Sequence, residues 1–191
     1  MLLLLNNDIE IINPNWIEEM LMYAQHKDVG IVGAKLYYGS GALQHAGVCI
    51  GMYGVSAHYF HRVDGSFNGY FGRLHCVQNM GGVTGACVML RKEVFKEVRG
   101  LDEGLAIAYN DIDLCLKILK AGYSIIWSPY VELYHHESIT RGYSDHDEAK
   151  KQQDKIEVVR FLESWKHFVD KGDPYYNVNL PKNRLDFKFE D

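Results

Sequence analysis

Apolar and polar positions in the first half of the chain form strand-like runs and one helical period. Residues 1–5 are a continuous apolar run, which is typical of a strand buried on both faces in the middle of a parallel sheet. Residues 13–24 open with an asparagine–proline pair and repeat apolar side chains at helical spacing, which predicts a helix that starts at this pair. Its expected apolar face consists of Ile17, Met20, Leu21 and Ala24. Residues 29–37 and 42–50 predict the next strands.

The second half of the chain shows the same periods with clearer boundaries. It predicts, in chain order, strand 83–90, helix 92–98, helix 111–122, strands 123–128 and 131–135, and helix 145–171. Residues 51–80 hold no period and predict a long loop region, and residues 173–191 predict a tail that lies across the surface. We therefore predict one α/β domain with a mixed sheet and helices on both faces.

Composition and charge exclude several functional classes. The chain has 191 residues, of which 47% are apolar, so it can bury a sizeable core. A net charge of −5 without a basic tract argues against nucleic acid as the main partner. The four cysteines have no CxxC spacing, which indicates a reducing compartment without a zinc-finger site, and we expect Cys87 and Cys115 to be buried thiols. No apolar run reaches the roughly 20 residues of a membrane-spanning helix. Four histidines also lack metal-ligand spacing and are expected in solvent or packed within loops: His45, His58, His61 and His75.

The candidate chemistry centres on the polar segment that opens the helix at Asp111. Asp111 and Asp113 lie in the first turn, where exposed N–H groups favour negative charge. Both residues can be simple helix caps, or they can carry chemistry. A glycine-rich segment at 81–91 precedes them and His135-His136 follows them, so a short loop carries acids on one side and histidines on the other. A second polar group, Asn6-Asn7-Asp8, follows the first strand, at the sheet edge where α/β folds bind ligands.

Six segments in this order resemble the motifs of family 2 glycosyltransferases of the GT-A fold. They are residues 4–8, 84–91, 99–103, 109–114, 121–138 with its Pro129 and two histidines, and the tail at 173–180. The tail resembles the end of bacterial members that build surface polysaccharides. The resemblance spans nearly the whole chain. It implies transfer of a sugar from a nucleotide diphosphate to a glycan or lipid-linked acceptor hydroxyl, with inversion.

On the donor side, the resemblance implies a divalent cation, magnesium or manganese, because charge builds on the departing diphosphate. Asp8 matches the last acid of the family's Asp-x-Asp motif and is the expected first metal ligand. Asn6 stands where the first acid is usual, and its amide would reach a ribose hydroxyl or a metal-bound water. His135 matches a histidine that joins the metal in some members; the alternative is a strand-end histidine bonded to backbone. Arg141 is expected to contact the diphosphate, although exposed loop arginines are common.

On the acceptor side, the resemblance implies that Asp111 is the catalytic base, which takes the proton as the acceptor oxygen attacks the anomeric carbon. Asn110 stands where the family usually has Glu, so a neighbouring charge is absent. Asp113 is expected to cap the helix or to brace its loop.

The resemblance also implies four acceptor contacts. Gly85 and Ala86 are small enough to let a sugar approach the backbone closely. Asp102 and Glu103 either contact the acceptor or brace the turn in which they lie. Two further aromatic residues near strand ends either stack on a sugar ring or fill the core: Trp127 and Tyr130.

The first strand sets expectations for the whole protein. Because a central strand rarely opens a fold, we expect the chain to be the later part of a larger domain. Residues 1–172 would be the acceptor and catalytic part of a GT-A domain truncated at its N-terminus, and residues 173–191 its tail. About 90 residues of βαβ units would precede Met1 and bind the nucleotide. The open edge of the first strand favours a homodimer. The resemblance implies a cytoplasmic location with peripheral association at the inner face of the membrane.

Two other hypotheses stay open. A carbohydrate-binding or scaffold domain without catalysis would explain Asn6 and Asn110. A small structural metal-binding module would use His135 and His136.

Overall fold

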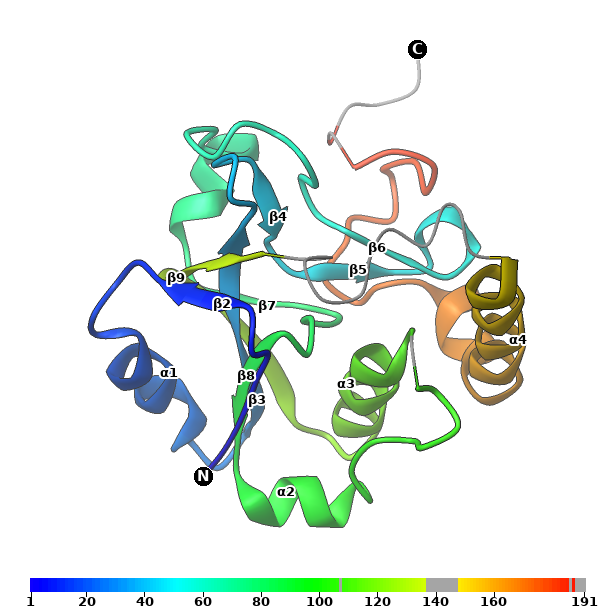
Figure 1. The fold of residues 1–191 in the computed structure, drawn as a ribbon. Helices are drawn as coiled ribbons and strands as arrows, with labels where there is room; N and C mark the ends of the chain where they lie inside the picture. The colour runs from blue at the N-terminus through cyan, green and yellow to red at the C-terminus, as the bar shows by residue number, and fades with distance from the viewer. Residues whose placement is uncertain (107, 137–147, 186, 188–191) are drawn as a thin grey trace.

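A mixed sheet runs through the computed structural model, which describes residues 1–106, 108–136, 148–185 and 187 (Figure 1). In this part of the chain, seven strands take the order β1-β8-β3-β9-β2, with β4 paired to β3 and β7 paired to β9. β3 and β9 are parallel, whereas the other pairs are antiparallel. The strands are β1 (Leu2–Leu5), β2 (Ile9–Ile11), β3 (Val29–Tyr37), β4 (Leu43–His45), β7 (Gln78–Asn79), β8 (Cys87–Leu90) and β9 (Ser124–His135). A separate hairpin-like pair consists of β5 (Val48–Ile50) and β6 (Ser56–His58).

Helices cover both faces of the sheet, as the sequence predicts. They are α1 (Trp16–Ala24), α2 (Lys92–Glu97), α3 (Asn110–Lys120) and α4 (Glu148–Lys171), with short 3-10 helices η1 (Met52–Gly54) and η2 (Tyr70–His75). Met20 of α1 shares a buried cluster with Val32, whereas Ile118 of α3 shares another with Ile31. Since neighbouring residues of a strand point to opposite faces, α1 and α3 lie on opposite sides of β3 (Figure 1). Among the described helices, none combines the length and apolar character needed to cross a membrane.

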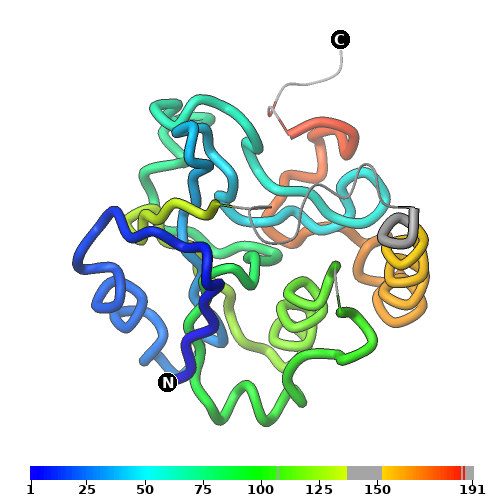
Figure 2. The backbone as a smooth tube through the Cα atoms, in the orientation of Figure 1, coloured from blue at the N-terminus to red at the C-terminus, as the bar shows by residue number. Residues whose placement is uncertain are grey.

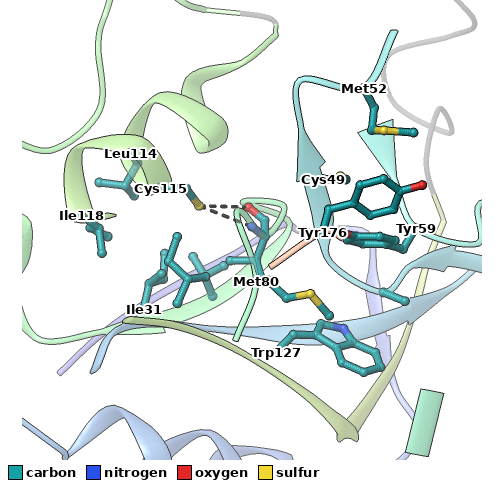
Figure 3. Packing of buried hydrophobic residues seen from close by; sticks show 14 of the residues in the cluster. Ile31, Cys49, Met52, Tyr59, Met80, Leu114, Cys115, Ile118, Trp127 and Tyr176 are labelled. Atoms are coloured by element: carbon teal, nitrogen blue, oxygen red, sulfur yellow. Dashed lines mark hydrogen bonds between the residues drawn. The ribbon is translucent and has the colours of Figure 1, made fainter. Parts of the chain in front are cut away.

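The largest buried cluster joins α3 to the sheet. Figure 3 shows Ile118 and Leu114 of α3 facing Ile31, with Trp127 deeper along the same cluster. The Cys115 thiol lies 3.4 Å from the Val83 nitrogen and 3.5 Å from the Val83 oxygen. These contacts hold residues 83–86 against α3, so β8 covers only the second half of the strand predicted at 83–90. Cys87 and Cys115 are buried, which confirms the prediction for both thiols.

The first strand differs from its prediction. We expected a strand buried on both faces among parallel neighbours, but β1 lies at one end of the sheet order and pairs antiparallel with β8. Leu3 and Leu5 are exposed, whereas Leu2 and Leu4 pack against the core. The alternation follows from one covered face and one open face.

The first helix starts later than its sequence pattern predicts. Asn13 does not cap it; instead the Asn13 side chain accepts a hydrogen bond from the Asn15 nitrogen, and α1 begins at Trp16. This start turns positions 16, 20 and 24 toward the sheet. Met20 and Ala24 are therefore buried as predicted, but Ile17 and Leu21 are exposed.

One continuous strand replaces the two strands predicted at 123–128 and 131–135. β9 runs from Ser124 to His135 and contains Pro129. Its register with β3 shifts between Gly33 and Lys35, opposite this proline. A proline is tolerated there because the ladder is already interrupted.

The loop region and the tail contribute more order than the sequence suggests. Residues 51–80 contain η1, β6, η2 and β7. In the segment after residue 172, which we expected to lie across the surface, Asp173, Tyr176 and Phe187 are buried, and both aromatic rings join the largest cluster. Figure 2 shows this segment returning alongside β5 and β6 toward the C-terminus.

We expect Gly33→Ala to lower the free energy of unfolding by about 1–3 kcal/mol, because a Cβ at this buried strand position would lie 2.5 Å from the Val83 Cβ. Gly82→Ala is the matched control, since its Cβ would meet its nearest neighbour at 3.4 Å, an ordinary contact. Urea unfolding of both variants measures the difference. Equal stability of the two variants would contradict the packing described around β3.

Candidate functional site

Three polar side chains meet where β1 and β9 end. β2 pairs with β9 so that Ile9 lies opposite His135, and this register brings the end of β1 beside the end of β9. His135 Nε2 lies 3.2 Å from Asp8 Oδ1 and 3.1 Å from Asn6 Nδ2. The backbone strengthens the arrangement, because the His136 nitrogen donates to the Asp8 carbonyl at 2.9 Å. The sequence-predicted residues Asn6, Asp8 and His135 therefore form one group.

The orientation of the His135 ring is set by Gln44 of β4. His135 Nδ1 lies 2.8 Å from Gln44 Oε1, while Gln44 Nε2 donates to the His135 carbonyl at 3.3 Å. Because the amide nitrogen of Gln44 is committed to that carbonyl, its oxygen accepts from Nδ1–H. In the tautomer with its single proton on Nδ1, the ring presents the lone pair of Nε2 to Asp8 and Asn6.

In the described part of the chain, Asp8 Oδ1 is buried and has no hydrogen-bond partner. A protonated His135 ring would pair with it at 3.2 Å, whereas a neutral ring with its proton on Nδ1 presents a lone pair to it. Two electron-pair donors that face each other fit a cation between them. Among the described residues, no group of three or more His, Cys, Asp or Glu side chains could hold a metal ion, so a cation here would rely on Asp8, His135 and oxygen atoms from outside this set.

Asp111 is held at the same edge by a backbone donor. Gly85 N–H donates to Asp111 Oδ2 at 2.9 Å, and the Ile112 nitrogen lies 2.8 Å from Asp111 Oδ1. A Cβ on Gly85 would lie 3.2 Å from the Asp111 Cβ, so the close approach favours glycine. The Asn6 nitrogen in turn donates to the Ala86 carbonyl at 2.9 Å. Direct contacts thus connect Asp111 to the Asp8 group through residues 85, 86 and 6.

The backbone before Asp111 is constrained on both sides. Tyr109 precedes α3 with φ of 61°, a left-handed conformation that costs free energy for a tyrosine, and its ring lies 5.2 Å from that of Phe161 on α4. Glu157 of α4 is fully buried, and its carboxylate accepts from Ala108 N at 2.7 Å and Ala106 N at 3.2 Å. α4 therefore sets the path of the chain into the first turn of α3.

Sequence reasoning missed Glu157, although the sequence carries a signal for it. The residue lies four positions before Phe161 and eight before Trp165, on the buried face of α4. A charged residue at an apolar position of a helix is rarely left without a partner. The partner is the loop before Asp111, which no local pattern identifies.

Two other acids of the predicted set brace α4. Asp113 accepts from Trp165 Nε1 at 2.8 Å and lies 2.6 Å from Lys117 Nζ, so it joins α3 to α4, whereas we expected it to cap the helix or to brace its loop. Asp102 forms a two-point pair with Arg160, at 2.9 and 3.1 Å, which holds the pKa of the Asp102 carboxyl below its usual range. Glu103 is exposed, and Arg141 lies outside the described residues.

The expectation for His45 was wrong. We placed His45 in solvent or within a loop, but it is fully buried in β4. Its Nε2 lies 3.3 Å from the nitrogens of both Gly47 and Thr84, and its Nδ1 lies 3.0 Å from His58 Nδ1. Burial holds the pKa of His45 well below its usual range, so the ring is neutral and can accept these bonds. His45 thereby fixes the residue that precedes Gly85.

The two aromatic residues that we considered for sugar stacking, Trp127 and Tyr130, differ in burial. Trp127 is fully buried, and its Nε1 donates to the Ala34 carbonyl at 3.0 Å, which identifies it as a core residue. Tyr130 is exposed, and its hydroxyl donates to the His75 carbonyl at 3.1 Å.

Comparison with known proteins links this geometry to a family. Residues 1–154 match the family described as "Glycosyltransferase like family 2". "Uncharacterized protein y4gI" of Sinorhizobium fredii is 48% identical over 185 residues, which cover 96% of this chain and 20% of that protein. "O-antigen biosynthesis protein RfbC" of Myxococcus xanthus is 37% identical over 191 residues, which cover 97% of this chain and 14% of that protein.

A shorter match covers a third of the chain. The "N-acetylglucosaminyl-diphospho-decaprenol L-rhamnosyltransferase" of Mycobacterium tuberculosis is 32% identical over 63 residues, 33% of this chain and 20% of that protein. The chain thus spans about a fifth or less of the length of the Sinorhizobium and Myxococcus relatives, and the 63 matched residues span a fifth of the Mycobacterium protein.

We expect Glu157→Gln to destabilise the protein by about 1–3 kcal/mol, because the fully buried carboxylate that accepts from Ala106 N, Ala108 N and Gln153 Nε2 becomes an amide. Hydrogen exchange of the Ala106 and Ala108 amides should accelerate more than that of β3. Glu163→Gln is the control, since Glu163 is an exposed acid on the same helix and should change stability by less than about 0.5 kcal/mol. Unchanged exchange in Glu157→Gln would show that α4 does not hold this loop.

Proposed function

This chain belongs to glycosyltransferase family 2, with the mixed α/β sheet of a GT-A-like fold, and on that premise we propose that it transfers a sugar from a nucleotide-diphosphate donor to an acceptor hydroxyl, with inversion. The acceptor class that we propose is a glycan or a lipid-linked glycan. The observation that carries the proposal is the Asp111 carboxylate, which Gly85 N–H orients at the edge where Asp8 and His135 meet.

In the proposed reaction, Asp111 is the general base. Its carboxylate accepts the proton of the acceptor hydroxyl while that oxygen forms a bond to the anomeric carbon. The bond between the anomeric carbon and the diphosphate oxygen breaks, and its electron pair leaves with the nucleoside diphosphate. Attack from the face opposite the leaving group inverts the configuration. We propose that Gly85 and Ala86 contact the acceptor beside Asp111, although Ala86 is buried in the cluster that α1 covers.

Asp8 and His135 are the proposed cation ligands. The orphaned Asp8 oxygen and the lone pair of His135 Nε2 support this role, and a bound magnesium or manganese ion would offset charge on the departing diphosphate. We propose that Asn6 contacts the ribose or a water at the cation, and that Arg141 contacts the diphosphate. Asp102 and Glu103 remain predicted acceptor contacts, although Asp102 already binds Arg160.

The biological setting is part of the proposal. The name of the Myxococcus relative refers to O-antigen biosynthesis, and that of the Mycobacterium relative to a lipid-linked sugar acceptor. We propose that the whole protein takes part in building a cell-surface polysaccharide at the cytoplasmic face of the membrane. The open edge of β1 supports a homodimer or another partner at that edge.

A non-catalytic scaffold is the second candidate. Asn6 and Asn110 replace acids that the family usually has, and a carbohydrate-binding domain would not need those charges.

We expect Asp111→Asn to lower the turnover number at least about 100-fold, because the amide accepts the Gly85 hydrogen bond but not a proton. Release of nucleoside diphosphate from UDP-, dTDP- and GDP-sugars measures it. Asp113→Asn is the control: it loses stability through Trp165 and Lys117 but keeps its turnover number while folded. Full turnover by Asp111→Asn would show that Asp111 is not the base, whereas no turnover by the unaltered protein with any of these donors would favour the scaffold candidate.

We also expect the binding of UDP to depend on manganese and to weaken at least about tenfold in Asp8→Asn, which removes the charged ligand. Calorimetric titration with and without Mn²⁺ tests this expectation. The control is Asp28→Asn. Asp28 is an exposed acid directly before β3, far from the strand ends where Asp8 lies, so this variant should bind UDP like the unaltered protein. Metal-independent binding of UDP would remove the cation role from Asp8 and His135.

A further inference from the structure

We propose that this chain holds a second glycan-binding site, in a cleft of about 700 Å³ between the ends of β3 and β9 and the loops at 38–42 and 62–66. None of the candidate residues discussed above lines this cleft. The ligand class is a neutral sugar residue of the acceptor glycan, at a distance from the reacting hydroxyl. The inference rests on the proposed function, because it takes the acceptor to be a glycan.

An aromatic pair forms one wall of the cleft. Tyr37 and Tyr134 lie opposite each other in the register of β3 and β9, with ring centroids 6.2 Å apart and planes tilted by 55°. Both rings are half-buried and line the cleft. Aromatic faces bind the apolar C–H face of a sugar, whereas its hydroxyls need polar partners nearby. Lys35 Nζ lies 5.2 Å from the centroid of the Tyr37 ring, and the parts of both rings that line the cleft are the surface we propose for a pyranose.

The polar partners are oriented before any ligand binds. The Tyr37 hydroxyl donates to Glu132 Oε1 at 2.7 Å, and Lys35 Nζ lies 3.5 Å from the same oxygen. Lys35 is buried and faces Glu132 from within the wall of the cleft. Across the cleft, Asp64 Oδ1 accepts from the nitrogen and the hydroxyl of Ser66, at 2.8 and 2.5 Å. Each carboxylate still has a second oxygen that can accept from sugar hydroxyls.

The loop that carries Asp64 is fixed in place. A Cβ on Gly65 would lie 2.3 Å from the Gly41 carbonyl oxygen and 2.9 Å from the Tyr37 ring, so the two loops are packed backbone to backbone. Ala42 forms a bridge with Asp64, and Arg62 adopts a left-handed φ of 65°. A wall that is already ordered loses little entropy when a ligand binds.

The charges at the cleft balance and do not favour a nucleotide or a phosphate. Its lining contains two carboxylates, from Asp64 and Glu132, and one guanidinium, from Arg62, while Lys35 pairs with Glu132. An anionic ligand would find no net positive charge here, whereas a neutral ligand with many hydroxyls would pair with both kinds of charge. Ile12 is the sole aliphatic side chain larger than alanine among the lining residues, so the cleft offers little surface to a lipid chain.

The cleft lies beside the Asp8 group and does not overlap with it. Glu132 and Tyr134 alternate along β9 with Leu133 and His135, so the two pairs point to opposite faces of the strand. The His136 ring stacks on Tyr134, with centroids 6.2 Å apart and planes 23° from parallel. A glycan bound on the tyrosines would therefore have to pass the strand end at His136 to reach the predicted reaction site.

Saturation-transfer NMR with N-acetylglucosamine, methyl α-L-rhamnoside and a rhamnosyl-N-acetylglucosamine disaccharide tests the site directly. We expect the ring protons of at least one of these sugars to receive saturation from the unaltered protein. Tyr134→Ala should reduce the transfer about five- to tenfold, as loss of a stacked aromatic face predicts. Tyr37→Phe keeps the aromatic ring and loses only the hydrogen bond to Glu132. It should reduce the saturation transfer less than Tyr134→Ala, and it tests the cleft without removing an aromatic side chain. Tyr130→Ala, an exposed tyrosine of the same strand outside the cleft, should bind like the unaltered protein.

No saturation of any probe by the unaltered protein, or equal losses in Tyr134→Ala and Tyr130→Ala, would overturn the inference.

A transfer assay separates this inference from the proposed function. Tyr134→Ala should raise the acceptor KM about five- to tenfold and leave kcat unchanged. If Asp111→Asn abolishes turnover while Tyr134→Ala leaves the acceptor KM unchanged, the inference fails and the proposed function stands. If Asp111→Asn keeps full turnover while the Tyr134-dependent binding persists, the sugar site stands and the proposed base is wrong.

Discussion

The hydrogen bond from Gly85 N–H to the Asp111 carboxylate connects the two halves of this structure. Asp111 belongs to the first turn of α3, where free N–H groups stabilise negative charge. Gly85 belongs to the segment that enters β8 beside β1. Each side of the bond has its own support: the Cys115 thiol holds Val83, and Glu157 holds the loop before Tyr109. A carboxylate constrained from both directions keeps one orientation, which a general base requires.

A very short strand supports both parts of the candidate site. In β4, Gln44 orients the ring of His135, and the next residue, His45, accepts from the backbone before Gly85. Consecutive residues therefore position the predicted cation ligand and the neighbour of the predicted base. Because His45 is buried and neutral, this support does not depend on a charge that titrates near neutral pH. The two parts cannot shift independently as long as β4 remains paired with β3.

The sequence predicted the elements whose signals are local. β3 and α3 follow from uninterrupted apolar patterns with clear ends, and the grouping of Asn6, Asp8 and His135 followed from a resemblance in the order of motifs. Other features depend on contacts between distant residues. Pro129 looks like the end of a strand until the bulge opposite Gly33 is known. Glu157 and His45 look like ordinary polar residues because their partners lie 49 and 39 positions away. The exposed face of β1 likewise depends on which strands lie beside it, and no pattern within five apolar residues records that.

The contact between Asn6 and His135 spans 129 positions of the chain, and it has a consequence for biosynthesis. A ribosome releases the chain from its N-terminus, so Asn6 and Asp8 emerge long before the histidine that completes their group. Glu157 emerges later still, and the Ala106 and Ala108 amides gain their carboxylate acceptor only then. Contacts between residues so far apart in sequence form slowly, because closing the long loop between them costs conformational entropy before the contacts stabilise the fold. The nascent protein therefore acquires its candidate site last, after α1 and β3 can already have packed. Premature termination within α4 would release a chain in which most helices are present but Asp8 and Asp111 are not yet held in place.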